Sequence, residues 1–256
     1  MIELRGIVKK FSGITVVNNV SFAVSPGEVL GYLGPNGAGK TTTIRMLAGL
    51  LEPTGGEIVI EGRDIRDDIY AYKKRLGYVP EQSEIYPHLS AYDYLVMVGR
   101  LRGLRERALK TKIIEFMKIF SLDQDMYGPI SSYSKGMRQK VLITAALLHD
   151  PDILLLDEPL SGLDVTTGLI IRDLIQKLAG ENKTIIYSSH VLEVTEQVCS
   201  RIIILYQGNI VANDSVGNLR SLMNLPSLTE IFSQLVVHED TGLAAERIVD
   251  TMKGSD

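Results

Sequence analysis

Residues 34–41, GPNGAGKT, carry the clearest chemical signal in the sequence. They match the pattern G-x-x-x-x-G-K-[ST] after a segment of strand length and before a helical pattern. Glycines let successive backbone amides converge on phosphate oxygens, while Lys40 adds a positive charge and Thr41 offers a hydroxyl to a phosphate-bound Mg²⁺. The stretch therefore predicts a loop that binds nucleotide phosphates. The expected contacts are Gly34, Pro35, Asn36, Gly37, Ala38, Gly39, Lys40, Thr41 and Thr42.

A pair of carboxylates, Asp157 and Glu158, ends the apolar run of DILLLDEP at residues 152–159. Such a run predicts a strand buried on both faces, where two charges are costly unless a cation or a polar site receives them. Because side chains alternate along a strand, we expect Asp157 to face Mg²⁺ and Glu158 to face a water in line with the γ-phosphate. The alternative is that both residues only cap or turn the strand.

A second stretch suited to an anion is SYSKGMRQKV at residues 132–141. Ser134 and Gly136 stand at the start of a predicted amphipathic helix, where a hydroxyl and open backbone amides can bind a negative group. In the simpler interpretation, Ser134 is only the N-cap of that helix. The buried stripe would then consist of Met137, Val141, Ala145 and Leu148.

The elements that must position these residues follow an alternating pattern. Strand-length segments at 28–34, 152–159 and 183–190 are each followed by a helical pattern, which predicts a parallel sheet covered by helices. Hairpin-like pieces add an antiparallel portion, at residues 1–24, 52–62 and 201–214.

Two helical patterns, at residues 91–104 and 106–120, have no strand between them and predict an inserted helical subdomain at about 83–150. We therefore expect an α/β fold with a P-loop NTPase core, a mainly parallel sheet and an N-terminal antiparallel β subdomain. The expected nucleotide-binding domain covers 1–215, and a helical tail covers 216–256. Short helices are predicted in that tail at 215–223, 227–236 and 243–252.

Composition narrows the class of protein. The chain has 256 residues, of which 45% are hydrophobic, so it can bury a large core. Its single cysteine, Cys199, excludes an internal disulfide and is expected to be a small buried residue. No apolar run approaches the roughly 18 residues that span a bilayer, so contact with a membrane is expected only through a partner. A net charge of −4 gives no general attraction to nucleic acid, and no nucleic-acid partner is expected.

Taken together, the motifs resemble the nucleotide-binding domain of ATP-binding cassette (ABC) transporters. GPNGAGKT, SYSKGMRQK, ILLLDEP, SGLD at 161–164 and the SSH that ends at His190 occur in the order and spacing of that family. The resemblance implies a P-loop ATPase that uses ATP and Mg²⁺. It also implies two cassettes packed head to tail as a homodimer or heterodimer, so that Ser134 and Gly136 would bind the γ-phosphate of the partner's ATP.

The resemblance assigns further roles. Glu158 would activate the attacking water, and His190 would contact the γ-phosphate. Asp164 would contact the opposite phosphate loop, or it would cap the following helix. Phe11 would stack on adenine, or it would be ordinary core. A glutamine usually completes the metal shell, and counting places Glu81 there with Gln82 next to it, so we favour Glu81 over a shift of one residue.

The segment YSKGM departs from the common LSGGQ signature at Tyr133, Lys135 and Met137, and it resembles cassettes of drug, sodium and antibiotic self-resistance exporters. Lys135 would add charge beside the nucleotide or remain solvated, and we favour the second. The expected partner is a multi-spanning permease, which would hold the chain at the cytoplasmic face of the membrane. The residues that would line a groove for it, or would be core, are Tyr86, Tyr92, Tyr94 and Leu95.

A competing class is a soluble ABC ATPase in assembly or on ribosomes, without a permease. A metabolic kinase with the same phosphate loop is a third class, but it needs an acceptor-binding lobe in place of SYSKGMRQK. The basic residues Arg100, Arg102, Arg105 and Arg107 would approach lipid headgroups or, as we favour, form a solvated helix face.

Overall fold

The computed structural model describes residues 1–82, 85–236, 249 and 251–252. Its larger sheet has the strand order β10-β9-β3-β8-β7-β6. The strands from β9 to β6 are parallel, and β10 is antiparallel to β9. The predicted mainly parallel sheet is therefore confirmed. Its strands are β3 (Val29–Leu33), β6 (Leu76–Val79), β7 (Ile153–Asp157), β8 (Thr184–Ser188), β9 (Arg201–Tyr206) and β10 (Asn209–Asp214).

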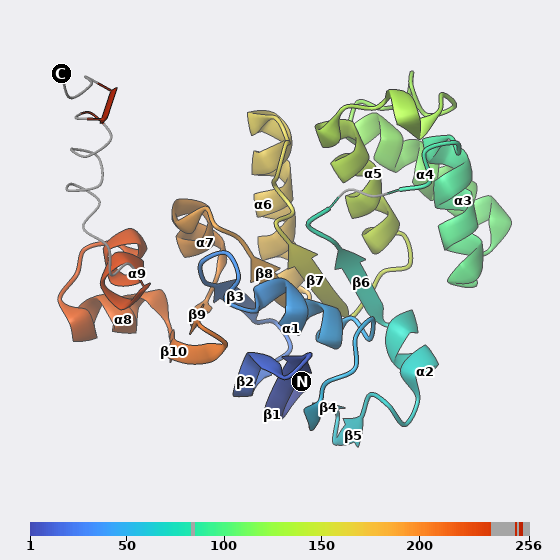
Figure 1. Cartoon of the computed structure of the whole chain (residues 1–256). Helices are drawn as coiled ribbons and strands as arrows, with labels where there is room; N and C mark the ends of the chain where they lie inside the picture. Colours follow the sequence, from blue (N-terminus) through green and yellow to red (C-terminus); the bar gives the residue numbers. More distant parts are fainter. Residues whose placement is uncertain (83–84, 237–248, 250, 253–256) are drawn as a thin grey trace.

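A smaller antiparallel sheet has the order β2-β1-β4-β5. It is built from the N-terminal hairpin and the segment after the first helix, as their hairpin-like patterns predicted, whereas the third hairpin-like piece, at 201–214, joins the larger sheet as β9 and β10. Figure 1 shows this sheet packed below α1 and the larger sheet. Its strands are β1 (Ile2–Phe11), β2 (Ile14–Val24), β4 (Gly55–Ile60) and β5 (Arg63–Asp64).

The helices lie on both sides of the larger sheet. Figure 1 shows α3, α4 and α5 grouped at the β6 edge, and α8 and α9 grouped at the opposite edge. The helices are α1 (Lys40–Leu47), α2 (Ile69–Lys74), α3 (Ala91–Leu101), α4 (Glu106–Ile119), α5 (Lys135–Leu147), α6 (Val165–Gly180), α7 (Leu192–Val198), α8 (Val216–Met223) and α9 (Leu228–Val236), with a 3-10 turn at Ile130–Ser132. The sequence patterns did not predict α2. The helix predicted at 243–252 lies largely outside the described residues.

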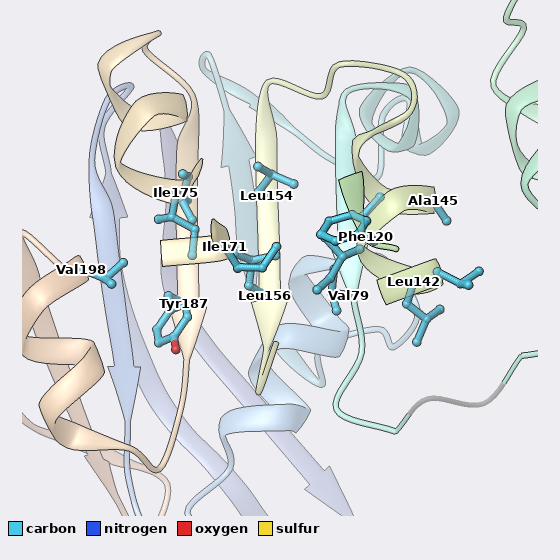
Figure 2. Packing of buried hydrophobic residues seen from close by; sticks show 14 of the residues in the cluster. Val79, Phe120, Leu142, Ala145, Leu154, Leu156, Ile171, Ile175, Tyr187 and Val198 are labelled. Carbon is cyan, nitrogen blue, oxygen red and sulfur yellow. The ribbon is translucent and has the colours of Figure 1, made fainter. Parts of the chain in front are cut away.

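The core is divided by the larger sheet, because side chains alternate along each strand. On β7, Leu154 and Leu156 join a cluster with α5 and α6, whereas Ile153 and Leu155 join a cluster with the smaller sheet and α1. Figure 2 shows the first cluster, in which side chains of β6, β7 and β8 meet those of the helices. The five residues of β7 are all buried, as the apolar run predicted.

Cys199 lies in the same cluster, and burial raises the pKa of its thiol. The expectation of a small buried residue is confirmed. Among the described helices, none is both long enough and apolar enough to cross a bilayer.

Candidate active site

The phosphate loop, residues 34–41, joins the end of β3 to the start of α1. At Gly39 φ is +105°, and a Cβ there would lie 2.8 Å from the carbonyl oxygen of Val16 on β2. A Cβ at Gly34 would lie 2.3 Å from the carbonyl oxygen of Leu205 on β9. Glycine is therefore required at both positions, because the loop lies directly against backbone carbonyls of two strands.

The start of α1 is open toward an anion. Its N-cap residue is Gly39, which has no side chain to accept from the first N–H groups of the helix. Those N–H groups have no partner inside the helix, and the helix dipole adds positive potential at this end. A phosphate group fits such a helix start.

Lys40 is buried and folds back onto its own loop. Its Nζ donates to the carbonyl oxygens of Gly34 at 2.7 Å and Pro35 at 3.1 Å. Burial lowers the pKa of Lys40, and the negative charges of Glu158 and Asp157 oppose that shift. A phosphate oxygen would replace the two carbonyls as the acceptor for this ammonium group.

Two neighbouring cavities meet at the loop. One has a volume of about 310 Å³ and the other about 560 Å³, and both are lined by Asn36, Glu81 and Glu158. The smaller cavity is also lined by Val16, Gly37, Gly39, Lys40, Thr41, Thr42 and Asp157. The larger cavity is also lined by Gln82, Lys135, Arg138, Ser161 and His190.

Asp157 ends β7 with its carboxylate buried. The hydroxyl of Ser188 donates to Oδ1 at 2.7 Å, and no described residue donates a hydrogen bond of normal geometry to the buried Oδ2. Burial raises the pKa of Asp157, and the nearby charge of Glu81 raises it further. A buried carboxylate oxygen without a donor is the kind of group that a cation stabilises.

Glu158 leaves the strand with a positive φ of 49°. Its Oε2 lies 2.8 Å from His190 Nδ1 and accepts a weak hydrogen bond of 3.5 Å from the hydroxyl of Ser189. Asp157 and Glu158 both line the smaller cavity, and of the two only Glu158 also lines the larger one. Their separate roles toward Mg²⁺ and the attacking water stay a prediction.

Glu81, and not Gln82, lies beside the phosphate loop. The hydroxyl of Thr41 donates to Glu81 Oε2 at 3.4 Å. Gln82 lines only the larger cavity. The structure thus places Glu81 at the position that the count along the sequence favoured.

The oxygen donors here suit Mg²⁺, which prefers hydroxyl, carboxylate and phosphate oxygens. Thr41 and Glu81 are in contact, and Asp157, whose buried Oδ2 has no donor of normal geometry among the described residues, lines the same cavity. No group of three or more His, Cys, Asp or Glu side chains among the described residues could enclose a metal. The donor set therefore fits an ion that takes part of its coordination from a bound phosphate.

The start of α5 is held against the loop that follows Glu158. Ser134 caps the helix by accepting from the Met137 N–H at 3.2 Å, so its capping role is confirmed and its anion-binding role stays a prediction. A Cβ at Gly136 would lie only 2.4 Å from the carbonyl oxygen of Gly162. Gly136 is therefore also required for close packing, a role that the sequence patterns did not predict.

Three polar contacts extend this packing. Lys135 Nζ donates to the hydroxyl of Ser161 at 2.7 Å, although the lysine is exposed and was expected to remain solvated. Gln139 donates to the Pro159 carbonyl oxygen at 3.1 Å, and Lys140 Nζ lies 3.0 Å from Asp164. The start of α5 is therefore packed and hydrogen-bonded against residues 159–164.

Asp164 is the N-cap of α6, which confirms one of its two expected roles. Its Oδ1 accepts from the Thr167 N–H and its Oδ2 from the Thr167 hydroxyl, both at 2.8 Å. These hydrogen bonds hold the pKa of Asp164 well below its usual range, together with the ion pair to Lys140.

Ser134 and Gly136 line neither of the two cavities, whereas Lys135 and Arg138 line the larger one. Within one chain, the structure thus does not bring the serine and glycine to the phosphate loop. Val16 does line the smaller cavity, and nothing in its sequence context marked it.

Phe11 is not part of the core. Its exposed fraction is 44%, and Lys9 Nζ lies 5.1 Å from the centre of its ring. The alternative of ordinary core is therefore wrong, because the aromatic ring stands at the end of β1, where the chain turns toward β2. Phe11 lines neither cavity.

The four residues that were expected to line a groove or to be core differ in burial. Leu95 is fully buried, and Tyr92 and Tyr94 pack partly against the same core cluster. Tyr86 has an exposed fraction of 63%, and its ring centre lies 6.5 Å from that of Tyr94.

Two of the four basic residues near α3 and α4 have side-chain partners in the fold, whereas Arg105 and Arg107 are exposed. Arg100 lies 2.8 Å from Glu106, and Arg102 donates to the Lys73 carbonyl oxygen. Arg105 and Arg107 line a separate, mostly apolar hollow on α4.

The amino-acid sequence is similar to those of ATP-binding proteins of transporters. A family model described as "ABC transporter" matches residues 17–161. The ATP-binding protein NatA of Bacillus subtilis is 38% identical over 242 residues, covering 93% of this chain and 98% of the relative. The Nod factor export ATP-binding protein I of Burkholderia lata is 33% identical, covering 82% of this chain and 69% of the relative.

Two solved structures share the fold. An ATP-binding subunit of an ABC transporter superposes with a TM-score of 0.86 at 30% identity, covering 92% of this chain and 99% of that one. The dimeric cassette MJ0796, in a post-hydrolysis state bound to ADP and phosphate, has a TM-score of 0.78 at 26% identity, covering 84% of this chain and 98% of that one.

Proposed function

The chain belongs to the ABC transporter ATPase family, and from that premise we propose that it powers a separate membrane permease that exports its substrate. The observation that carries the proposal is the cavity in which the phosphate loop meets Asp157, Glu158 and Glu81. It combines an anion-binding helix start, a buried ammonium group and carboxylates at one place. That combination suits phosphoryl transfer from ATP to water.

In the proposed reaction, ATP places its phosphates on the amides of the phosphate loop, and Lys40 exchanges its two carbonyl acceptors for phosphate oxygens. Glu158 accepts a hydrogen bond or a proton from the attacking water, so that the water oxygen bonds to the γ-phosphorus while the bond to ADP breaks. In the structure, His190 Nδ1 contacts Glu158 Oε2. In the proposed reaction, the exposed ring of His190 rotates away from this contact toward the γ-phosphate. Phe11 is exposed and would stack on the adenine.

Mg²⁺, held by Thr41, Asp157 and Glu81, would neutralise the charge of the β- and γ-phosphates. Gln82 lies next to this shell and lines the larger cavity instead. The rest of the chemistry belongs to side chains of the protein itself.

We further propose a head-to-tail dimer, as a homodimer or a heterodimer. Ser134 and Gly136 line neither cavity of their own chain, which supports their delivery to the ATP of a second cassette. One of the solved relatives is a dimer with ADP and phosphate. Closure would bring the serine hydroxyl and helix amides to the γ-phosphate across the interface.

The permease would hold the chain at the cytoplasmic face of the membrane. The export direction is supported by the YSKGM segment and by a relative named for Nod factor export. The exposed ring of Tyr86 and the adjacent Tyr94 are the residues that we assign to the permease contact.

Affinity purification of the full-length chain from its own cells tests the assignment. A multi-spanning membrane protein should copurify, and it should raise ATP hydrolysis when both are reconstituted in vesicles. Tyr86→Ala should weaken copurification, whereas Tyr70→Ala, which changes another exposed tyrosine, should not. Copurification with ribosomes or a soluble assembly instead would favour the competing class.

A further inference from the structure

The C-terminal helices α8 and α9 pack beside α7, the helix that begins two residues after His190. Figure 1 shows the three helices together at one edge of the molecule. Leu228 and Ile231 of α9 are fully buried, and they share a core cluster with Val198 and Cys199 at the end of α7. The helix pair is therefore part of the packed core and not a loose extension.

Glu196 on α7 is the polar centre of this contact. Arg220 of α8 forms an ion pair with Glu196, and the Leu228 N–H at the start of α9 donates to Glu196 Oε2 at 3.4 Å. Only 20% of the Glu196 side chain is exposed. One carboxylate thus joins α7 to both helices of the tail, and partial burial makes the loss of either partner costly.

A chain of hydrogen bonds leads from α7 to the proposed catalytic pair. The hydroxyl of Thr195, next to Glu196, donates to the Val191 carbonyl oxygen at 3.0 Å. The Val191 N–H donates to Ser189 Oγ at 3.0 Å, and that hydroxyl in turn contacts Glu158 at 3.5 Å. His190 stands between Ser189 and Val191, so the backbone that carries it is fixed from both sides.

We propose that Glu196 and Arg220 are positioning residues for the hydrolysis step, which makes the C-terminal helices a support for His190 and Glu158. The tail contacts α7, α7 is hydrogen-bonded to residues 189–191, and these set the backbone from which the exposed His190 ring reaches Glu158 at 2.8 Å. None of these hydrogen bonds and ion pairs involves a residue of the phosphate loop or of α1. The inference rests on the proposed roles of Glu158 and His190 in ATP hydrolysis.

The test compares Glu196→Ala, Arg220→Ala and the double variant in the full-length chain. Each single change should lower kcat for ATP hydrolysis about tenfold. KM and the Kd for ATP should stay within about twofold, because nucleotide binding depends on the phosphate loop. The double variant should be no slower than the slower single variant, since both changes interrupt the same contact.

Glu28→Ala is the matched control. It removes an ion pair in which Glu28 Oε1 lies 2.6 Å from Arg201 Nε. This pair is partly buried and lies at the start of β3, away from the proposed site. This variant should lose stability but keep its kcat. A fall in kcat of the same size in Glu28→Ala would overturn the proposal, because general loosening would then explain the effect.

A spectroscopic readout separates positioning from stability. The chain has four histidines, and the ring resonances of His190 can be assigned with His190→Gln. In Arg220→Ala these resonances should shift while those of His149 stay unchanged. Unchanged kcat and unchanged His190 resonances in both single variants would refute the inference, whereas absence of ATP hydrolysis in the wild-type chain would instead refute the proposed function.

Discussion

His190 Nδ1 lies 2.8 Å from Glu158 Oε2, so the proposed general base is already held in place before nucleotide binds. The Glu158 side chain is largely buried, whereas 71% of the His190 side chain is exposed. The carboxylate is therefore fixed and the imidazole is free to turn. Holding one reacting group in advance lowers the entropic cost of reaching the transition state.

Glu158→Gln should abolish turnover and keep ATP binding. Loss of a positioned general base costs about 10² to 10⁴ in rate, while the amide retains the shape of the side chain. Two measurements check this: the rate of phosphate release, and gel filtration, which detects dimers that form when ATP is present. Glu181→Gln, an exposed change at the end of α6, should behave as wild type. Release at the wild-type rate from Glu158→Gln would contradict the assignment.

Lys40→Ala should weaken ATP binding itself. A charge-assisted hydrogen bond contributes about 1.5 to 3 kcal/mol, so we expect the Kd to rise by about one to two orders of magnitude. Nucleotide titration measures this directly. Lys177→Ala, which removes an exposed lysine from α6, is the control and should leave the Kd unchanged.

Glu81→Ala and Gln82→Ala distinguish the two candidates for the metal shell. Because the Thr41 hydroxyl contacts Glu81 at 3.4 Å, Glu81→Ala should raise the Mg²⁺ concentration for half-maximal hydrolysis by about tenfold. Gln82→Ala should change it little. The opposite ranking would show that the loop shifts by one residue when nucleotide and metal bind.

Gly136→Ala should destabilise the chain, because the new Cβ would lie 2.4 Å from the Gly162 carbonyl oxygen. Overpacking of this kind costs about 1 to 3 kcal/mol in the free energy of unfolding. Gly168→Ala in α6 is a matched control with no atom within 4 Å of its Cβ, and it should stabilise by about 0.5 to 1 kcal/mol. Urea unfolding of both variants measures the difference, and equal stabilities would contradict the packing role.

His149 should make the protein less stable in mild acid. Burial lowers the pKa of His149 below its ordinary value of 6.5, and the positive charge of Arg102 lowers it further. Its Nε2 lies 3.0 Å from the Leu76 carbonyl oxygen, and its buried Nδ1 has no hydrogen-bond partner among the described residues. Protonation would thus bury an N–H without an acceptor.

The sign of the pH effect follows from proton counting. Below pH 6.5 the unfolded chain takes up the proton before the folded chain does, so folding weakens as the pH falls through that value. One proton changes the folding equilibrium constant by at most about tenfold per pH unit. His149→Gln should remove this part of the slope between pH 7 and 5.5 in urea titrations. An unchanged slope would contradict the prediction.

The sequence by itself determined the parts of the site that depend on neighbouring residues. The spacing in GPNGAGKT, together with its place between a strand and a helix, is enough to predict an anion-binding loop, because the backbone of a few residues forms the whole structure. The same holds for the caps Ser134 and Asp164, which accept from N–H groups three residues later. The alternation of strands and helices predicted the parallel sheet because helices that follow successive strands can cover both faces of such a sheet.

Only the tertiary structure decided the contacts between distant segments. It placed Glu81 at Thr41, left Phe11 exposed, and set both carboxylates of residues 157 and 158 in one cavity. It also joined α7 to the tail through Glu196. These contacts depend on how elements cross and where each strand ends, and packing geometry of that kind leaves no periodic trace in the local sequence.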